Sequence, residues 1–290
     1  MNDKSNPALA AIWMIGAILS FTSMAVAGRA VSFELDTFEI MMFRSFIGIA
    51  IVSLVVLATG RQREVTSRSL RIHLIRNLSH FAGQNLWFYA ITVIPLAQVF
   101  ALEFTLPIWA MFLAIIVLGE PLTRTRLAVA LVGFAGVLIV TRPWIGGISP
   151  GAAMAALAAV GFAGSAVFTR LLTRTETIFC ILFWLTVMQA TFGVICAGID
   201  GDIAVPSAQS WPWIGVISCA GLVAHFCLTK ALSLAPAAVV TPVDFARLPL
   251  IVVVGAVLYN ESVDPAVLLG AALIFAANYY SILTETRRNR

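Results

Sequence analysis

The chain consists largely of uninterrupted apolar runs of about twenty residues, and this feature limits the folds that it can adopt. Wound as a helix, such a run is long enough to cross the hydrocarbon core of a bilayer. Apolar residues make up 60% of the sequence and charged residues only 11%, which argues against a soluble protein. We therefore predict an all-α integral membrane protein. Its ten transmembrane helices are predicted at residues 8–27, 37–59, 71–93, 97–118, 125–141, 150–169, 178–198, 211–233, 237–259 and 265–283.

Basic residues are concentrated in alternate connections between these predicted helices. If the N-terminus is cytoplasmic, only Arg29 and Arg142 lie on the outer side. The cytoplasmic flanks then hold Lys4, Arg61, Arg63, Arg68, Arg71, Arg124, Arg126, Arg170, Arg174, Lys230, Arg287, Arg288 and Arg290. This distribution follows the positive-inside rule. We therefore expect both termini, including a basic tail at 284–290, to be cytoplasmic. Because the positive charge follows the membrane topology, it does not indicate that the protein binds nucleic acid.

The sequence also repeats itself at a spacing of 141 positions. The matched residues include Pro95 and Pro236, Phe104 and Phe245, and Glu120 and Glu261. Each copy holds five predicted helices, so we predict two domains, residues 8–141 and 149–283. Because five is an odd number, the second copy should sit inverted in the membrane, and in such transporters the substrate site lies near the bilayer midplane between the repeats.

Glu103 and Asp244 form another matched pair and place acidic side chains inside otherwise apolar helices. Each follows its matched proline by eight residues, roughly 12 Å along a helix, which brings it near the middle of a hydrocarbon core of about 30 Å. Gln84 and His225, also 141 positions apart, reach a similar depth. An ionisable group at this depth is costly unless it faces a partner or a wet cavity. We predict that these four side chains line a substrate site.

Both acidic residues also have a structural interpretation. Asp244 can form an ion pair with Arg247, three residues later on the same helix, and Glu103 can pair with Arg44 or Arg76. Arg44 lies deep in the second predicted helix and has no basic counterpart in the second half. It suits an anionic substrate group or, equally, the carbonyl groups of a broken helix.

Several other polar and aromatic residues are predicted near the same level. His80, Gln84 and Trp87 share one helical face, and Asn85 follows Gln84. Trp87 and Trp109 are the two tryptophans that we expect to stack against a flat substrate. His225 has the chemistry of a proton relay, although a buried histidine or amide also serves simply to hold helices together. The predicted substrate-binding residues are therefore Glu103, Asp244, Gln84, His225, Arg44, Arg247, Trp87, Trp109, Asn85 and His80.

Prolines and glycines indicate how the helices bend and pack. Pro107, Pro242 and Pro249 interrupt the fourth and ninth predicted helices, which frees carbonyl groups for a ligand or produces a static kink. Gly136 and Gly270 permit close helix contact within one protomer or between two, so the protein is predicted to be a monomer or a homodimer. The four cysteines show no paired spacing, and neither a zinc site nor a disulfide framework is indicated.

Short motifs connect these features to a known family. The first half contains Phe88-Tyr89-Ala90-Ile91, Pro95-Leu96-Ala97, Leu118-Gly119-Glu120-Pro121 and Gly133-Phe134-Ala135-Gly136. This pattern resembles the EamA repeat of the drug/metabolite transporter superfamily, over nearly the whole chain. The second copy departs from the family by having Asn260 before Glu261 where a glycine is usual. The resemblance implies ten helices, a central cavity and secondary transport by alternating access.

Within that superfamily the chain looks most like bacterial importers of the riboflavin or S-adenosylmethionine type. Aromatic and amide side chains at the midplane favour riboflavin or a similar vitamin or cofactor, carried across the bacterial inner membrane. The alternative is an exporter of amino acids or drugs, with or without proton coupling, and a more remote one is a membrane-embedded enzyme or scaffold. No nucleotide-binding loop, metalloprotease helix or nucleophile elbow is present, so we do not expect an ATP-driven pump. We also expect no enzyme activity and no cofactor, and the expected partners are a small-molecule substrate and the lipid bilayer.

Overall fold

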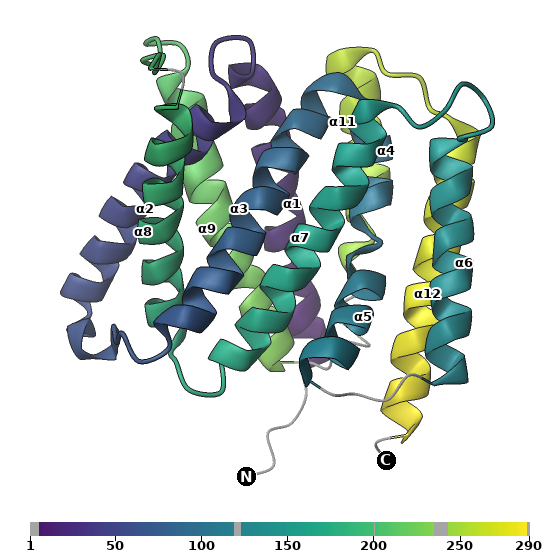
Figure 1. Ribbon diagram of the computed structural model, residues 1–290, viewed down its shortest axis with the longest axis horizontal. Helices are drawn as coiled ribbons and strands as arrows, with labels where there is room; N and C mark the ends of the chain where they lie inside the picture. Colours follow the sequence, from purple (N-terminus) through teal and green to yellow (C-terminus); the bar gives the residue numbers. More distant parts are fainter. Residues whose placement is uncertain (1–5, 119–122, 200, 235–242, 289–290) are drawn as a thin grey trace.

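The computed structural model describes residues 6–118, 123–199, 201–234 and 243–288. Within these ranges the regular elements are helices (Figure 1). They are α1 (Pro7–Val31), α2 (Thr37–Ala58), the 3₁₀ turn η1 (Gln62–Glu64), α3 (Leu70–Val93), α4 (Leu96–Glu103), α5 (Leu106–Leu118), α6 (Arg124–Thr141), α7 (Pro150–Leu172), α8 (Ile178–Ala197), α9 (Trp211–Leu234), α11 (Arg247–Tyr259) and α12 (Pro265–Arg288). Three landmarks of the predicted repeat, Glu120, Pro236 and Pro242, lie outside the described residues.

Six segments of the described chain are long and apolar enough to cross a membrane. They are Ala8–Val31, Thr37–Ala58, Leu96–Val117, Pro150–Leu172, Ile178–Ala197 and Trp211–Ala231. Shorter apolar helices cover Leu127–Thr141, Arg247–Tyr259 and Pro265–Ser281. The 24-residue helix α3 has the length, but its row of arginine, histidine and amide side chains lowers its hydropathy. The prediction of a multi-pass helical membrane protein is confirmed, whereas the count of ten crossings and the side on which the termini lie stay predictions.

The helices of the two halves pack against one another in matched pairs. α1 lies along α9, α3 along α7, α2 along α8, and α6 along α12, and Figure 1 shows α6 and α12 as a pair at one end of the bundle. Adding 141 to the residue numbers of α1 and α3 carries them approximately onto α7 and α9. The repeat therefore relates α1 to α7 and α9 to α3, so the contact between α1 and α9 corresponds to the contact between α7 and α3. Equivalent helices therefore make equivalent contacts between the two halves of the chain.

Glycines allow two of these pairs to approach closely. A Cβ on Gly161 would lie 2.7 Å from the Cα of Gly83, so α3 and α7 touch through their backbones. A Cβ on Gly270 would lie 2.7 Å from the carbonyl oxygen of Gly136, and one on Gly136 would lie 2.8 Å from that of Gly270. This second contact joins α6 and α12 of the same chain. Gly136 and Gly270, which the sequence predicts to permit close contact within or between protomers, thus make that contact within one protomer.

The short helix α4 is the most enclosed element described. Val99, Phe100, Ala101 and Leu102 are fully buried, and α4 packs against α7, α11, α12 and α3. These buried apolar side chains belong to the main core cluster, together with residues of α1, α3 and α7. Because α4 ends at Glu103, the fold carries this carboxylate into the centre of the bundle.

Candidate functional site

Two breaks in the helices lie at matched positions of the repeat. Phe104 and Thr105 form a turn between α4 and α5, and Phe245 and Ala246 form a turn just before α11. The break after Glu103 has a local cause, because Pro107 has no N–H to donate to the carbonyl of residue 103 and its ring would clash with that carbonyl. The predicted interruption at Pro107 is thus confirmed. Each break directly follows one of the two acidic residues.

One of the carbonyl groups freed at the first break, that of Phe104, has a protein partner. The side chain of Asn278, on α12, donates a hydrogen bond from Nδ2 to the carbonyl oxygen of Phe104 at 2.8 Å, and Asn278 is buried. A buried carbonyl without a partner is costly, so this amide stabilises the broken helix. It also ties the break to the last helix of the chain.

Arg247 bridges the two acidic side chains. One of its terminal nitrogens lies 3.1 Å from Glu103 Oε1 and 3.2 Å from Asp244 Oδ2. The side chain of Arg247 is 5% exposed, that of Glu103 13% and that of Asp244 24%. With all three groups ionised, the cluster carries one surplus negative charge. The remaining Asp244 oxygen, Oδ1, is buried and meets no hydrogen-bond donor among the described residues.

Aromatic rings surround this charge cluster. The guanidinium carbon of Arg247 lies 4.9 Å from the ring centroid of Phe21, 5.0 Å from that of Phe100 and 5.2 Å from that of Phe104. The rings of Phe104 and Phe245 stack at 4.1 Å with an interplanar angle of 18°. A cation is attracted to the face of an aromatic ring, and the rings also exclude water. The cluster therefore combines a low-dielectric wall with fixed charges.

The amides and tryptophans predicted near this level have different surroundings. Trp87 donates a hydrogen bond from Nε1 to Glu103 Oε2 at 2.8 Å, so it contacts the acidic residue, and its stacking against a substrate stays a prediction. Asn85 donates to the carbonyl of Phe81 one turn earlier. The Gln84 side chain is buried, and its Nε2 has no partner within the described part of the chain.

Trp109 packs against α6 instead of the charge cluster. Its ring lies edge-on to that of Phe134 with centroids 5.3 Å apart, and its Nε1 donates to Thr105 Oγ1 at 3.2 Å. Trp109 lies one turn beyond the helix break, and its indole reaches back to Thr105 within the break. These contacts give Trp109 a packing function in this conformation.

A second group of polar residues contains two facing imidazoles. The rings of His80 and His225 lie 5.7 Å apart, and His80 Nδ1 is 3.5 Å from Ser165 Oγ. Phe21 lies edge-on to His225 at 5.9 Å and also contacts Arg247. The imidazoles are thereby connected to the charge cluster through one aromatic ring.

Two arginines flank the imidazoles. Arg76 is buried and donates to Thr169 Oγ1 at 3.1 Å and to Asn77 Oδ1 at 2.7 Å. Arg44 is half-buried, and among the described residues its guanidinium meets one acceptor, the thioether sulfur of Met41 at 3.8 Å. A thioether is a weak acceptor, so the Arg44 guanidinium retains most of its capacity to bind an anion.

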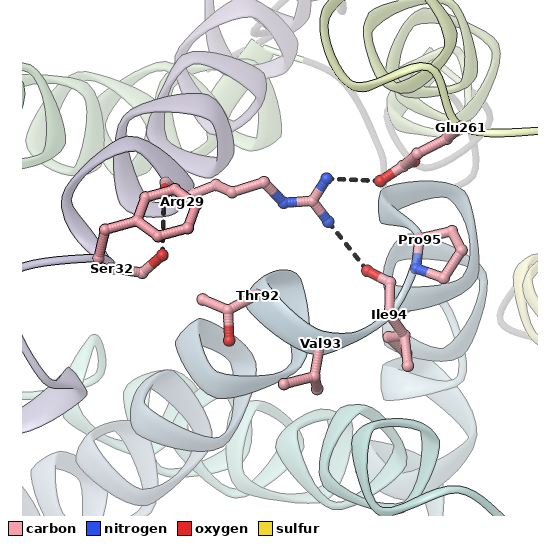
Figure 2. Close-up of a pocket in the computed structure, with 8 residues that line it drawn as sticks. Arg29, Ser32, Thr92, Val93, Ile94, Pro95 and Glu261 are labelled. Atoms are coloured by element: carbon pink, nitrogen blue, oxygen red, sulfur yellow. Dashed lines mark hydrogen bonds and ion pairs between the residues drawn. The ribbon is translucent and has the colours of Figure 1, made fainter.

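A separate ion pair joins the two halves of the chain (Figure 2). Arg29 pairs with Glu261 and donates to the carbonyl of Ile94 at 2.9 Å, while Glu261 Oε2 accepts from the backbone N–H of Leu96 at 2.9 Å. Arg29, Ile94 and Glu261 are among the residues that line a cavity of about 360 Å³. Sequence reasoning matched Glu261 with Glu120 but missed this pairing, because the partner of each charge is set by helix packing.

The structure groups the predicted site residues as follows. Glu103, Asp244, Arg247 and Trp87 form one cluster, and His80 and His225 form a second one beside it. The alternative pairing of Glu103 with Arg44 or Arg76 is wrong, because Glu103 pairs with Arg247. The pairing of Asp244 with Arg247 is present. Sequence reasoning missed the aromatic ring at Phe21.

The sequence pattern of one family matches both halves of the chain, at residues 8–142 and 149–283, and this family is described as the EamA-like transporter family. The chain belongs to the EamA-like transporter family. It is thus a membrane transporter of the EamA type.

Individual transporters resemble this chain over most of its length. An S-adenosylmethionine uptake transporter of Rickettsia conorii is 26% identical over 288 residues, which cover 99% of this chain and 97% of that protein. A riboflavin transporter of Brucella anthropi is 29% identical over 255 residues, covering 87% and 90% of the two chains. A solved crystal structure superposes with a TM-score of 0.67 at 20% identity, covering 97% of this chain and 99% of the other, and supports the fold alone.

Proposed function

We propose that this EamA-type protein is a secondary transporter that takes up a small metabolite across the bacterial inner membrane by alternating access. The observation that carries the proposal is the bridge from Arg247 to Glu103 and Asp244, built at two matched helix breaks in the interior of an apolar bundle. Charged groups are rarely kept at such a place without a function. Broken helices at the interface of two repeats are typical of substrate sites in secondary transporters.

The charge of the cluster supports a positively charged substrate. Two carboxylates face one guanidinium, and Asp244 Oδ1 has no donor among the described residues. A substrate cation beside that oxygen would cancel the surplus charge, and the rings of Phe104 and Phe245 would attract it. Riboflavin is uncharged and would leave the surplus in place. Our first choice of substrate is therefore an organic cation of the S-adenosylmethionine type. The Rickettsia relative is named as an uptake transporter for S-adenosylmethionine.

Arg44 supports the same choice from the other end of the substrate. Its guanidinium has only the Met41 thioether as an acceptor among the described residues, and a carboxylate would form a charge-assisted bond with it. S-Adenosylmethionine carries a sulfonium, an ammonium and a carboxylate group. We propose that the sulfonium binds at Asp244 and Glu103, where its single charge cancels the surplus. The amino-acid end, in which the ammonium offsets the carboxylate, binds through its carboxylate at Arg44.

Riboflavin is the second candidate. The buried Gln84 amide with a free Nε2 suits the polar edge of a flat ring, and the Brucella relative is a riboflavin transporter. The two candidates differ in charge, so binding experiments separate them. S-Adenosylhomocysteine provides a matched control, because it lacks the sulfonium methyl group and its charge but keeps the rest of S-adenosylmethionine.

The test is thermal unfolding of the purified protein in detergent with each of the three compounds. A ligand at 100 times its dissociation constant stabilises the folded state by about 2.7 kcal/mol. We expect a shift with S-adenosylmethionine, a smaller one with S-adenosylhomocysteine and none with riboflavin. Equal shifts with the first two compounds would overturn the charge argument, and a shift with riboflavin alone would establish the second candidate.

Variants locate the binding site. Asp244→Asn and Arg44→Gln each remove one proposed ligand contact, and both should reduce the shift caused by S-adenosylmethionine. Glu64→Gln is the matched control, since Glu64 lies in η1 and pairs with Arg61 at the surface. The proposed site is wrong if the two test variants bind S-adenosylmethionine as tightly as Glu64→Gln does.

A further inference from the structure

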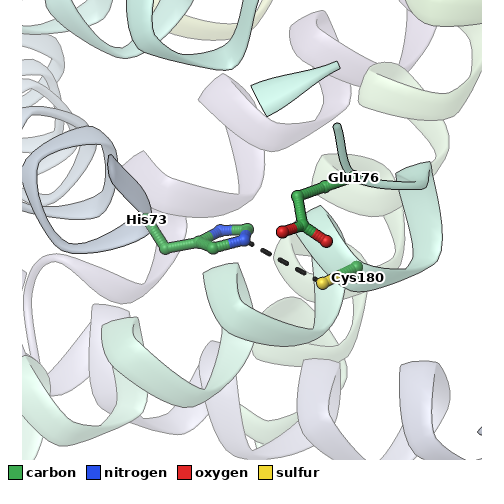
Figure 3. Close-up of side chains that lie close together, drawn as sticks. All are labelled: His73, Glu176 and Cys180. Atoms are coloured by element: carbon green, nitrogen blue, oxygen red, sulfur yellow. Dashed lines mark hydrogen bonds between the residues drawn. The ribbon is translucent and has the colours of Figure 1, made fainter. Parts of the chain in front are cut away.

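Three side chains with different metal-binding atoms meet where α3 begins and α7 leads into α8 (Figure 3). His73 lies in the first turn of α3, Glu176 in the turn before α8, and Cys180 in the first turn of α8. One ligand atom from each residue lies within 4.8 Å of those of the other two. His73 Nε2 and Cys180 Sγ are 3.9 Å apart. The charge cluster at Arg247 shares none of these residues.

The three groups converge on one point instead of forming a catalytic relay. In a nucleophilic triad the acid holds the imidazole nitrogen that faces away from the nucleophile. Here that nitrogen, His73 Nδ1, has no partner among the described residues. Figure 3 shows Glu176 on the same side of the ring as Cys180. An imidazole, a thiol and a carboxylate directed at a common centre are the arrangement of a metal site.

Burial and unused bonding capacity support a ligand at this centre. His73 and Cys180 are fully buried, so their polar atoms are shielded from water. Glu176 Oε1 is buried and meets no donor among the described residues, whereas its other oxygen, Oε2, accepts a hydrogen bond from Thr66 at 2.8 Å. A buried carboxylate oxygen without a partner is costly, and a bound cation would supply one.

The donor set and the spacing fit zinc. Zn²⁺ binds thiolate sulfur at about 2.3 Å and imidazole nitrogen at about 2.0 Å, and a tetrahedral arrangement then puts those two atoms roughly 3.5 Å apart. The observed separation of 3.9 Å requires only a small side-chain adjustment. We propose that His73, Glu176 and Cys180 form a binding site for Zn²⁺ or a similar thiophilic divalent cation, with a fourth position left to water.

Such a site would join the two halves of the chain. His73 belongs to the first half, and Glu176 and Cys180 belong to the second. The surroundings already hold Glu176 in place. The hydroxyl group of Thr66 donates a hydrogen bond to Glu176, and the backbone carbonyl oxygen of Thr66 accepts one from Trp184 Nε1 at 2.7 Å. A metal ion here would fasten the start of α3 to the turn before α8. No spacing motif in the sequence indicates this site, since the histidine lies far from the other two ligands along the chain.

Cobalt binding tests the proposal directly. The full-length protein is purified without a histidine tag, stripped with a chelator, and titrated with Co²⁺, which replaces zinc in such sites and gives a near-ultraviolet thiolate charge-transfer absorption. We expect one equivalent to bind with that absorption, and Zn²⁺ to displace it. Absence of the absorption in the folded wild-type protein would overturn the proposal.

Variants decide which residues are ligands. Cys180→Ser should abolish the thiolate absorption. His73→Gln and Glu176→Gln should each weaken Co²⁺ binding at least tenfold, because even the loss of a group that only hydrogen-bonds a metal ligand typically lowers metal affinity tenfold or more. Cys219→Ser is the matched control, because Cys219 is exposed elsewhere in the chain, and it should bind as the wild type does. An absorption that persists in Cys180→Ser, or binding unchanged in both Gln variants, would refute the site. Neither result depends on what the protein transports.

Discussion

Replacing Arg247 by methionine should destabilise the protein strongly while keeping the volume of the side chain. The substitution leaves Glu103 and Asp244, which are 13% and 24% exposed, without the cation that bridges them at 3.1 and 3.2 Å. Removing one partner of a buried ion pair costs about 3–5 kcal/mol, because the remaining charge stays buried without compensation. We expect Arg247→Met to lower the free energy of unfolding by that amount.

The origin of this loss can be separated from lost packing by removing the acids as well. A triple variant with Arg247→Met, Glu103→Gln and Asp244→Asn has the same methionine but no uncompensated charge. A buried ion pair replaced by neutral groups of similar volume is often close to neutral in stability. The triple variant should therefore recover most of what Arg247→Met loses, and the difference between the two variants measures the electrostatic part.

The assay is equilibrium unfolding in mixed micelles, followed by tryptophan fluorescence and checked for reversibility. Arg61→Met is the matched control, because Arg61 is 48% exposed and pairs with Glu64 at 3.5 Å, and an exposed pair contributes about 1 kcal/mol or less. The reasoning is refuted if Arg247→Met unfolds at the same point as Arg61→Met. It is also refuted if the triple variant is no more stable than Arg247→Met.

Three further predictions follow from the packing, the second ion pair and a loop carboxylate. Gly136→Ala should cost about 1–3 kcal/mol in the same assay, since its Cβ would lie 2.8 Å from a carbonyl oxygen of α12. Glu261→Gln should cost about 3 kcal/mol, because it leaves the 12% exposed Arg29 without its carboxylate. The pKa of Glu34 is lowered, first by the hydrogen bond from Ser210, so its contribution is present above the unfolded pKa and lost as the pH falls through the lower folded pKa. The protection of the amides at residues 207–211, measured as exchange relative to the intrinsic rate at the same pH, should therefore fall on acidification in the wild type. Glu34→Gln should show lower protection already at neutral pH and respond less to acid.

Features set by local sequence could be predicted well. The apolar runs placed most helices, and Pro107 indicated the break after Glu103, because a proline disturbs the turn that precedes it wherever it occurs. The pair of Asp244 and Arg247 also follows from local spacing, since residues three apart share a helix face. The matched positions of the two acids follow from the internal repeat, which can be read directly along the chain.

Features set by packing between helices could not be predicted. Arg247 and Glu103 are far apart in sequence, and which arginine reaches Glu103 depends on how α11 meets the end of α4. The hydrogen bond from Trp87 Nε1 to Glu103 also depends on how α3 is rotated against α4. The donors at His73, Glu176 and Cys180 likewise converge only through the contact between α3 and α8.

The claim that Glu103 and Asp244 mark the transport site is tested most directly by substrate flux. Purified protein is reconstituted into liposomes, and entry of labelled S-adenosylmethionine is followed for the wild type, Glu103→Gln, Asp244→Asn and the surface control Glu64→Gln. We predict accumulation of unmodified substrate with the wild type and the control, and at least a tenfold lower initial rate with either neutralised acid. Full flux in both Glu103→Gln and Asp244→Asn would contradict the account.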